Sequence, residues 1–149
     1  MAKSIMSKEE IQAKTGVNLI LSFWVMLVVS VAVVFLAHLW FPTSVVLGTH
    51  TLSVSWSLLL SMSFLSLLGV WGMAGVAYHE WRRGRVYSPK DWMTAYFVFN
   101  VVAIWVIARF ATHLGFGISH WWVALLLGLA LDFAQGAAMM GLGNVMFLK

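Results

Sequence analysis

Four long apolar stretches constrain this chain more than any other feature, and they lie at about residues 17–41, 54–79, 92–114 and 121–146. An α-helix rises about 1.5 Å per residue, so about 20 apolar residues cross the hydrocarbon core of a bilayer. Each stretch reaches that length. Only 9% of the residues are charged, against about 25% in an ordinary soluble domain. We therefore predict an all-α, polytopic membrane protein whose four transmembrane helices form two hairpins, each running in–out–in.

Basic residues predict the orientation of these helices. They gather in the connector from Glu80 to Asp91, whereas the connectors at 42–53 and 115–120 contain no Lys or Arg. Because cytoplasmic loops carry the excess of basic residues, we expect this connector and both termini in the cytoplasm, and the protein in a bacterial inner membrane. The basic side chains are also expected to contact anionic lipid headgroups. They are Arg82, Arg83, Arg85 and Lys90.

Polar and turn-forming residues predict where the helices begin and end. Residues 1–16 are polar and form either an N-terminal tail or an interfacial helix, while residues 17–149 form the four-helix transmembrane domain. The β-branched residues around Gly48 predict a tight turn or a small hairpin between the first two spans. Ser88 followed by Pro89 is typical of a helix N-terminus, so the third span begins there.

Two of the connectors resemble those of a known family. The first contains Phe41-Pro42 followed by Val45-Val46-Leu47-Gly48, and the second contains Gly115-Phe116-Gly117-Ile118. Together with the four-span topology, these turns are similar to those of the four-span phage-holin-like superfamily of small bacterial membrane proteins. The resemblance implies an architecture more than a function. The chain departs from the family's pattern in its longer basic connector and in Asp132.

A short internal repeat links the two halves of the chain. Leu52–Leu60 and Ile118–Leu126 both begin with an apolar residue and a serine, continue through a tryptophan and end in a leucine-rich run. Each segment leads into a span that returns to the cytoplasm. The two hairpins would therefore be parallel repeats related by an axis along the membrane normal.

A carboxylate interrupts the fourth apolar stretch. Asp132 lies near the middle of Trp121–Asn144, roughly 15 Å from either end. An ionised side chain that faces lipid at this depth costs several kcal/mol. We therefore expect Asp132 to face protein or water, on the side of the helix where small residues recur every fourth position.

Small residues predict which helix faces pack closely. They let two helices approach each other in a membrane, and their hydroxyl groups return hydrogen bonds to backbone carbonyls. Serines that line a polar path across the membrane are the alternative interpretation. The residues expected in packing are Ala124, Gly128 and Gly136 on the fourth span and Ser57, Ser61, Gly69 and Gly72 on the second.

Arg109 is the predicted partner of Asp132. Counted from the turn between the third and fourth spans, Arg109 lies roughly 9 Å deep and Asp132 roughly 16 Å deep, and their side chains lean toward each other. We predict an intramembrane ion pair, either within one chain or between two. A polar network is expected around this pair. Gln135 solvates the carboxylate, Asn100 bonds to the first or second span or to another subunit, and His113 shares the face of Arg109.

The functional prediction rests on chemistry that the sequence lacks. Cysteine is absent, and we find no nucleophile–base arrangement, paired carboxylates or phosphate-binding glycine loop. We predict a non-enzymatic protein that uses no cofactor or metal and binds no nucleic acid. Helix–helix assembly in the bilayer, as a holin-like homo-oligomer or as an accessory or scaffold subunit, is the preferred function. A small transporter or channel with a site at Asp132 and Arg109 is the first alternative, and a haem-binding electron-transfer subunit using His38 and His113 is the second.

Overall fold

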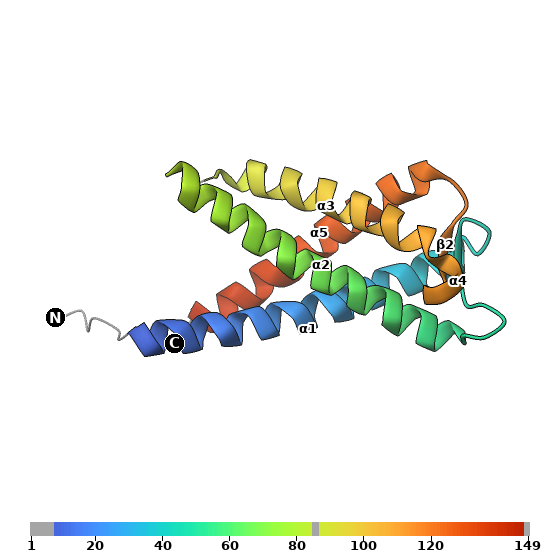
Figure 1. Cartoon of the computed structure of the whole chain (residues 1–149), viewed down its shortest axis with the longest axis horizontal. Helices are drawn as coiled ribbons and strands as arrows, with labels where there is room; N and C mark the ends of the chain where they lie inside the picture. The colour runs from blue at the N-terminus through green and yellow to red at the C-terminus, as the bar shows by residue number, and fades with distance from the viewer. Residues whose placement is uncertain (1–7, 85–86, 148–149) are drawn as a thin grey trace.

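The computed structural model describes residues 8–84 and 87–147, with side chains described between residues 20 and 141, and it is almost entirely helical (Figure 1). Four helices are long and apolar enough to cross a membrane, which confirms the predicted set of four. The structure also contains two strands of three residues each, of which the second was not predicted and the first was expected only as part of a local hairpin. In chain order the elements are α1 (Lys8–Trp40), β1 (Val45–Leu47), α2 (Val54–Arg83), α3 (Pro89–Arg109), α4 (Ala111–Leu114), β2 (Phe116–Ile118) and α5 (Trp121–Phe147).

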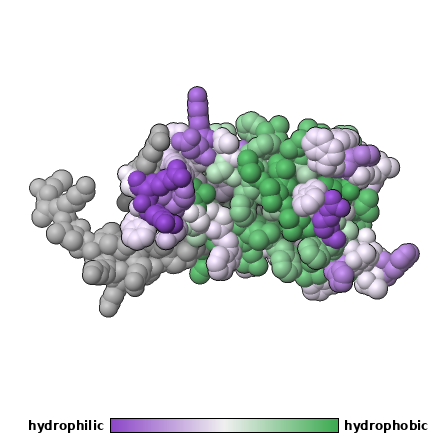
Figure 2. All heavy atoms as spheres, turned by 45° about the horizontal axis from the view of Figure 1, so that its top comes forward, coloured by the Kyte–Doolittle hydropathy of each residue, from purple (hydrophilic) through white to green (hydrophobic). Residues whose placement is uncertain are grey.

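The four long helices form a ring in which each packs against two others. The contacts run from α1 to α2, from α2 to α3, from α3 to α5 and from α5 back to α1. The two strands lie at one end of the bundle, here named the sheet end, and the α2–α3 connection lies at the other, here named the loop end (Figure 1). Figure 2 shows hydrophobic residues as a band across the middle of the molecule, with hydrophilic residues toward both ends. This distribution is the one that a bilayer requires.

Local capping explains several helix boundaries. The Ser88 hydroxyl accepts a hydrogen bond from the Asp91 backbone N–H, and the Asp91 carboxylate accepts one from the Ser88 backbone N–H. This capping box confirms the start predicted for the third span. Gly84 ends α2 in the left-handed conformation, with a φ of 59°, which glycine adopts without steric cost. Because α1 is continuous from Lys8, the polar residues at its start belong to the same helix as the first span.

The two connectors at the sheet end pair with each other. Strands β1 and β2 are antiparallel, with Val45 opposite Ile118 and Leu47 opposite Phe116. The sequence predicted a tight turn or a local hairpin in the first connector. The strand instead finds its partner about 70 residues later in the chain, because the second connector presents its own unpaired backbone groups at the same end of the bundle. The pairing ties the two helical hairpins together.

The strand pairing also gives a structural alignment of the two halves of the chain, which can be compared with the predicted repeat. Each half of the chain contains a helix, a strand and a returning helix, in the order α1–β1–α2 and α3–α4–β2–α5. An antiparallel pair has a local two-fold axis, here between Val46 and Gly117. A rotation about this axis places Leu47 on Ile118, whereas the sequence match placed Leu52 on Ile118. The difference arises because six residues lie between β1 and α2 whereas two lie between β2 and α5. In addition, the sequence match places Ser55, rather than Val54 at the start of α2, on Trp121.

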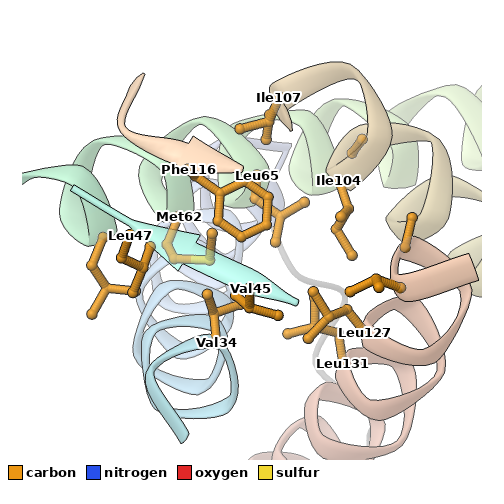
Figure 3. Close-up of a cluster of buried hydrophobic side chains, with 14 of the residues drawn as sticks. Val34, Val45, Leu47, Met62, Leu65, Ile104, Ile107, Phe116, Leu127 and Leu131 are labelled. Carbon is orange, nitrogen blue, oxygen red and sulfur yellow. The ribbon is translucent and has the colours of Figure 1, made fainter. Parts of the chain in front are cut away.

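The hydrophobic core lies mainly beneath the sheet (Figure 3). Phe116 of β2 and Val34 of α1 have no exposed surface, and Leu131 of α5 has none either. Side chains from both strands and from all four long helices meet here. This cluster packs the interior of the bundle at its sheet end. The labelled members are Val34, Val45, Leu47, Met62, Leu65, Ile104, Ile107, Phe116, Leu127 and Leu131.

Candidate functional site

A cleft of about 300 Å³ opens between the helices in the loop-end half of the bundle. We name it the Asp132 cleft, after the only acidic side chain that lines it. Helices α3 and α5 form most of its wall, and they diverge from the sheet end toward the loop end (Figure 1). Its lining consists of Met26, Met73, Trp92, Met93, Tyr96, Asp132, Phe133, Gln135, Gly136, Ala137, Met139 and Met140.

Two glycines of α5 explain why a cleft forms here. A Cβ atom added at Gly128 would lie 2.5 Å from Val101 Cγ2 and 3.2 Å from the Val101 backbone nitrogen. Helices α3 and α5 are therefore in close contact at Gly128. Eight residues later, a Cβ atom at Gly136 would meet no atom within 4 Å. The two helices have separated by this point, and Asp132 lies on α5 between the close contact and the open position.

Asp132 is half-buried and faces this cleft. Within the described part of the chain, its carboxylate has no hydrogen bond and no ion pair. The Tyr96 side chain on α3 lines the same cleft and lies within electrostatic range of the carboxylate. We predicted that Asp132 would face protein or water rather than lipid alone, and its side chain lines a cleft between helices.

The predicted ion pair between Arg109 and Asp132 does not form within the described chain. The Arg109 guanidinium lies over the Trp105 ring, 4.5 Å from its centroid, on an exposed surface. From the Gly128–Val101 contact, Arg109 lies eight residues toward the sheet end and Asp132 four residues toward the loop end, which separates them by about 18 Å along the bundle. The pair does not form within one chain because α3 ends at Arg109, which places this residue at the end of a span rather than inside it. A pair between two chains stays a prediction.

A buried polar chain crosses the bundle beside the cleft. Asn100 on α3 donates a hydrogen bond from Nδ2 to Gln135 Oε1 at 3.1 Å. Gln135 on α5 donates from Nε2 to Ser30 Oγ on α1 at 3.0 Å, and Ser30 donates to the Met26 carbonyl oxygen at 2.6 Å. Asn100 was expected to bond to the first or second span or to another subunit, and Gln135 was expected to solvate Asp132. The structure instead bonds the two amides to each other. Ser30 was missed, although it is a lone hydroxyl within a long apolar run.

His113 does not join this network. It lies in α4 at the sheet end, exposed, and its Nδ1 is 3.0 Å from the Thr112 hydroxyl oxygen. The His38 Nδ1 is 2.8 Å from the Val45 carbonyl oxygen and thereby fastens α1 to β1. Among the residues that the structure describes, no three His, Cys, Asp or Glu side chains come together to hold a metal ion.

Most of the predicted packing residues face neighbouring helices of the same chain. Gly69 faces the Met26 side chain, and Gly72 faces the Phe99 ring. Ser57 and Ser61 are fully buried. Internal contacts therefore account for most of the predicted packing residues, including Ala124 and Gly128, while Gly136 is left open to the cleft.

Two buried serines fill the sheet end of α2. The Ser61 hydroxyl donates to the Leu114 carbonyl oxygen at 3.0 Å. Ser57 occupies the space that a side chain at Gly115 would need. Both positions serve the contact of α2 with α4 and the start of β2, so they fasten the first hairpin to the second.

Glu80, near the end of α2, bonds to residues just before and within the first turns of α3. Glu80 Oε1 accepts hydrogen bonds from the Tyr87 backbone N–H at 2.6 Å and from the Trp92 indole N–H at 3.2 Å. The Tyr87 hydroxyl in turn bonds to His79. These contacts, which sequence reasoning missed, fix the Trp92 ring in the wall of the Asp132 cleft.

The basic residues of this end are exposed where the structure describes them. Arg82 and Arg83 lie in the last turn of α2, and Lys90 lies in the first turn of α3. Arg85 lies outside the described residues. The Arg82, Arg83 and Lys90 side chains are therefore accessible for the predicted contact with lipid headgroups.

No protein-family model matches the chain, and neither the curated proteins nor the solved structures contain a significant match to it. The resemblance to holin-like proteins therefore rests on the turn residues and the four-span topology alone.

Proposed function

We propose that this chain is a non-enzymatic integral membrane protein that carries a cation across a bilayer, with Asp132 as the charged group of its binding site. One observation carries the proposal: the Asp132 carboxylate lines a cleft of about 300 Å³ and has no ion pair or hydrogen bond within the described residues. Ionisable residues inside a membrane usually face a cavity or another charge, and they mark pathways for ions and substrates.

The position of Asp132 supports a transport site. It follows the start of α5 by 11 residues, or about 16 Å along the helix, which is close to the middle of a bilayer. Transporters built from repeated halves bind their substrates near the midplane, at the interface between the halves. The Asp132 cleft has this character, because residues from both hairpins line it.

The orientation in the membrane is part of the proposal. We place the loop end in the cytoplasm of a bacterial cell, since it carries Arg82, Arg83 and Lys90 and basic residues concentrate on the cytoplasmic side. The chain contains no cysteine, so single cysteines at Thr49 and Ser88 give an unambiguous test. A membrane-impermeant maleimide added to intact cells should label only the cysteine at Thr49. Labelling of the one at Ser88 alone would reverse the orientation.

Charge movement in reconstituted membranes tests the transport proposal. Proteoliposomes on a solid-supported membrane are exposed to jumps in sodium, potassium, ammonium, protons and a panel of organic cations. We expect at least one of them to produce a current that Asp132→Asn abolishes and Asp132→Glu retains. Glu10→Gln is the matched control, because Glu10 precedes Met26, the cleft residue of α1, by 16 residues, or about 24 Å of helix. Folded wild-type protein that gives no current with any cation would overturn the proposal.

Assembly by helix contact is the second candidate function, as a holin-like homo-oligomer or as an accessory subunit. The observation that favours it is open space beside three glycines, Gly75, Gly136 and Gly141, where an added Cβ atom would meet nothing within 4 Å. Such positions allow the close approach of another helix. Native mass spectrometry from nanodiscs should then show a defined oligomer that Gly75→Leu weakens, and only monomers at every protein concentration would contradict it.

A further inference from the structure

The polar groups of the Asp132 cleft restrict what can bind there. The Gln135 amide oxygen accepts a hydrogen bond from Asn100, and its amide nitrogen donates one to Ser30. The Trp92 indole N–H is bonded to Glu80. Within the described residues, only the Asp132 carboxylate and the Tyr96 hydroxyl remain without a hydrogen bond. A ligand therefore meets one negative charge and one hydroxyl group.

This polar inventory fits a small metal cation poorly. Sodium, calcium and magnesium ions are bound through several oxygen ligands at once, commonly six or more for calcium. The cleft offers a single carboxylate, and the described residues contain no group of three acidic or histidine side chains. Sugars and other polar solutes would lose the hydrogen bonds that they make to water without replacing them. An anion would be repelled by Asp132.

The rest of the wall is apolar and adaptable. Five methionines line the cleft, together with the rings of Trp92, Tyr96 and Phe133. Methionine is flexible and polarizable, and methionine-rich surfaces accept ligands of different shapes. An aromatic face attracts a cation, most strongly where water is excluded. The volume of about 300 Å³ is at the lower end of the range for pockets that bind organic molecules.

We infer that the Asp132 cleft binds a lipophilic organic cation, in which a single positive charge is carried on a largely apolar or aromatic body. Quaternary ammonium, phosphonium and protonated arylamine compounds belong to this class. The charge pairs with Asp132, the apolar body packs among the methionines, and the Trp92 and Tyr96 rings contact the cationic centre. The inference rests on the proposed function in one respect, that the cleft is a solute site, and it specifies the chemical class of the solute.

Binding to protein in nanodiscs tests this class directly. We choose tetraphenylphosphonium as the cationic probe and triphenylphosphine oxide as a neutral aromatic control, both titrated by calorimetry against empty nanodiscs. Tetramethylammonium serves as a cation without an apolar body. We expect saturable binding of tetraphenylphosphonium at one site per chain, and at least tenfold weaker binding of the other two compounds.

Variants then assign the binding to the cleft. Asp132→Asn should weaken tetraphenylphosphonium binding at least tenfold. Asp132→Glu keeps the charge and should retain part of the binding, and the control Glu10→Gln should change it less than threefold. Gly136→Phe fills the cleft and leaves the carboxylate in place, so it should also weaken binding at least tenfold. The space beside Gly136 lets this variant fold, so it carries the test if Asp132→Asn is recovered in poor yield.

The outcomes separate this inference from the transport proposal. Saturable binding of tetraphenylphosphonium without any charge movement would uphold the inference and overturn transport. Currents driven by protons or metal cations, with no binding of tetraphenylphosphonium, would uphold transport and overturn the inference. Equal binding of the neutral control, or unchanged binding in both Asp132→Asn and Gly136→Phe, would also overturn the inference. The probe would then bind through nonspecific hydrophobic contact rather than at the Asp132 cleft.

Discussion

Two glycines on one helix allow the packing of α3 against α5 to be measured against an internal control. Gly128 lies at a close contact of the two helices, where an added Cβ atom would stand 2.5 Å from Val101 Cγ2. Gly136 lies two helical turns further along, with nothing within 4 Å of an added Cβ atom. We predict that Gly128→Ala destabilises the protein and that Gly136→Ala does not.

The expected difference follows from the contacts. Replacing glycine by alanine inside a helix gains about 1 kcal/mol of intrinsic propensity, and this gain is the same at both positions. Overpacking costs about 1–3 kcal/mol. The cost at Gly128 should be near 2 kcal/mol, because valine in a helix has one strongly preferred rotamer and its backbone nitrogen also lies 3.2 Å from the added atom. The two variants should therefore differ by about 2 kcal/mol.

Unfolding of both variants in mixed micelles, followed by circular dichroism, measures this difference. The double variant Gly128→Ala with Val101→Ala removes the Cγ2 atom that the new methyl group meets, so it should recover part of the loss. Equal stability of the two single variants would refute the proposed α3–α5 contact. Greater damage from Gly136→Ala would refute the open position beside Gly136, and it would point to a second chain seated there.

Three further predictions concern the other polar contacts. Gln135→Leu removes two hydrogen bonds that contribute about 0.6 kcal/mol each and leaves the buried Asn100 amide unpaired, so it should cost about 2 kcal/mol in the same unfolding assay. Adding Asn100→Leu to it should restore part of that loss, and additive losses would contradict the shared bond. Arg109→Gln should cost less than about 1 kcal/mol, because the guanidinium contacts only an exposed ring; collapse of the folded yield would show instead that Arg109 neutralises a buried charge. Glu80→Gln should speed hydrogen exchange at the Tyr87 amide, measured by mass spectrometry, and unchanged protection would argue against the contact.

Much of the fold follows from local patterns in the sequence. Four apolar stretches predict four helices because a lipid-exposed backbone must satisfy its own hydrogen bonds. The capping box at Ser88 was predictable since its donors and acceptors lie within four residues. The strand pair was not, because three-residue strands carry almost no periodic signal and their partners are distant in the chain.

The candidate site was predicted only in part, and the reason is geometric. Helical spacing places Asp132 and Gly136 on one face correctly. It did not predict the bond of Asn100 to Gln135, because the helix that Asn100 meets depends on tertiary packing. The pairing of Arg109 with Asp132 depended on where α3 ends and on how the two helices are aligned. An error of a few residues at a helix end moves a side chain by several ångströms, which is enough to replace a predicted ion pair with a contact to Trp105.

The unpaired carboxylate connects the fold to the proposed function. An aspartate at the centre of a membrane helix costs about 2.5–3.5 kcal/mol, and within the described residues nothing neutralises Asp132. The sheet end supplies compensating stability, because its core and strand pairing clamp the two hairpins together. The divergence of α3 and α5 beyond Gly128 then holds the carboxylate in a hollow of methionines and aromatic rings, where a lipophilic cation would supply the missing charge.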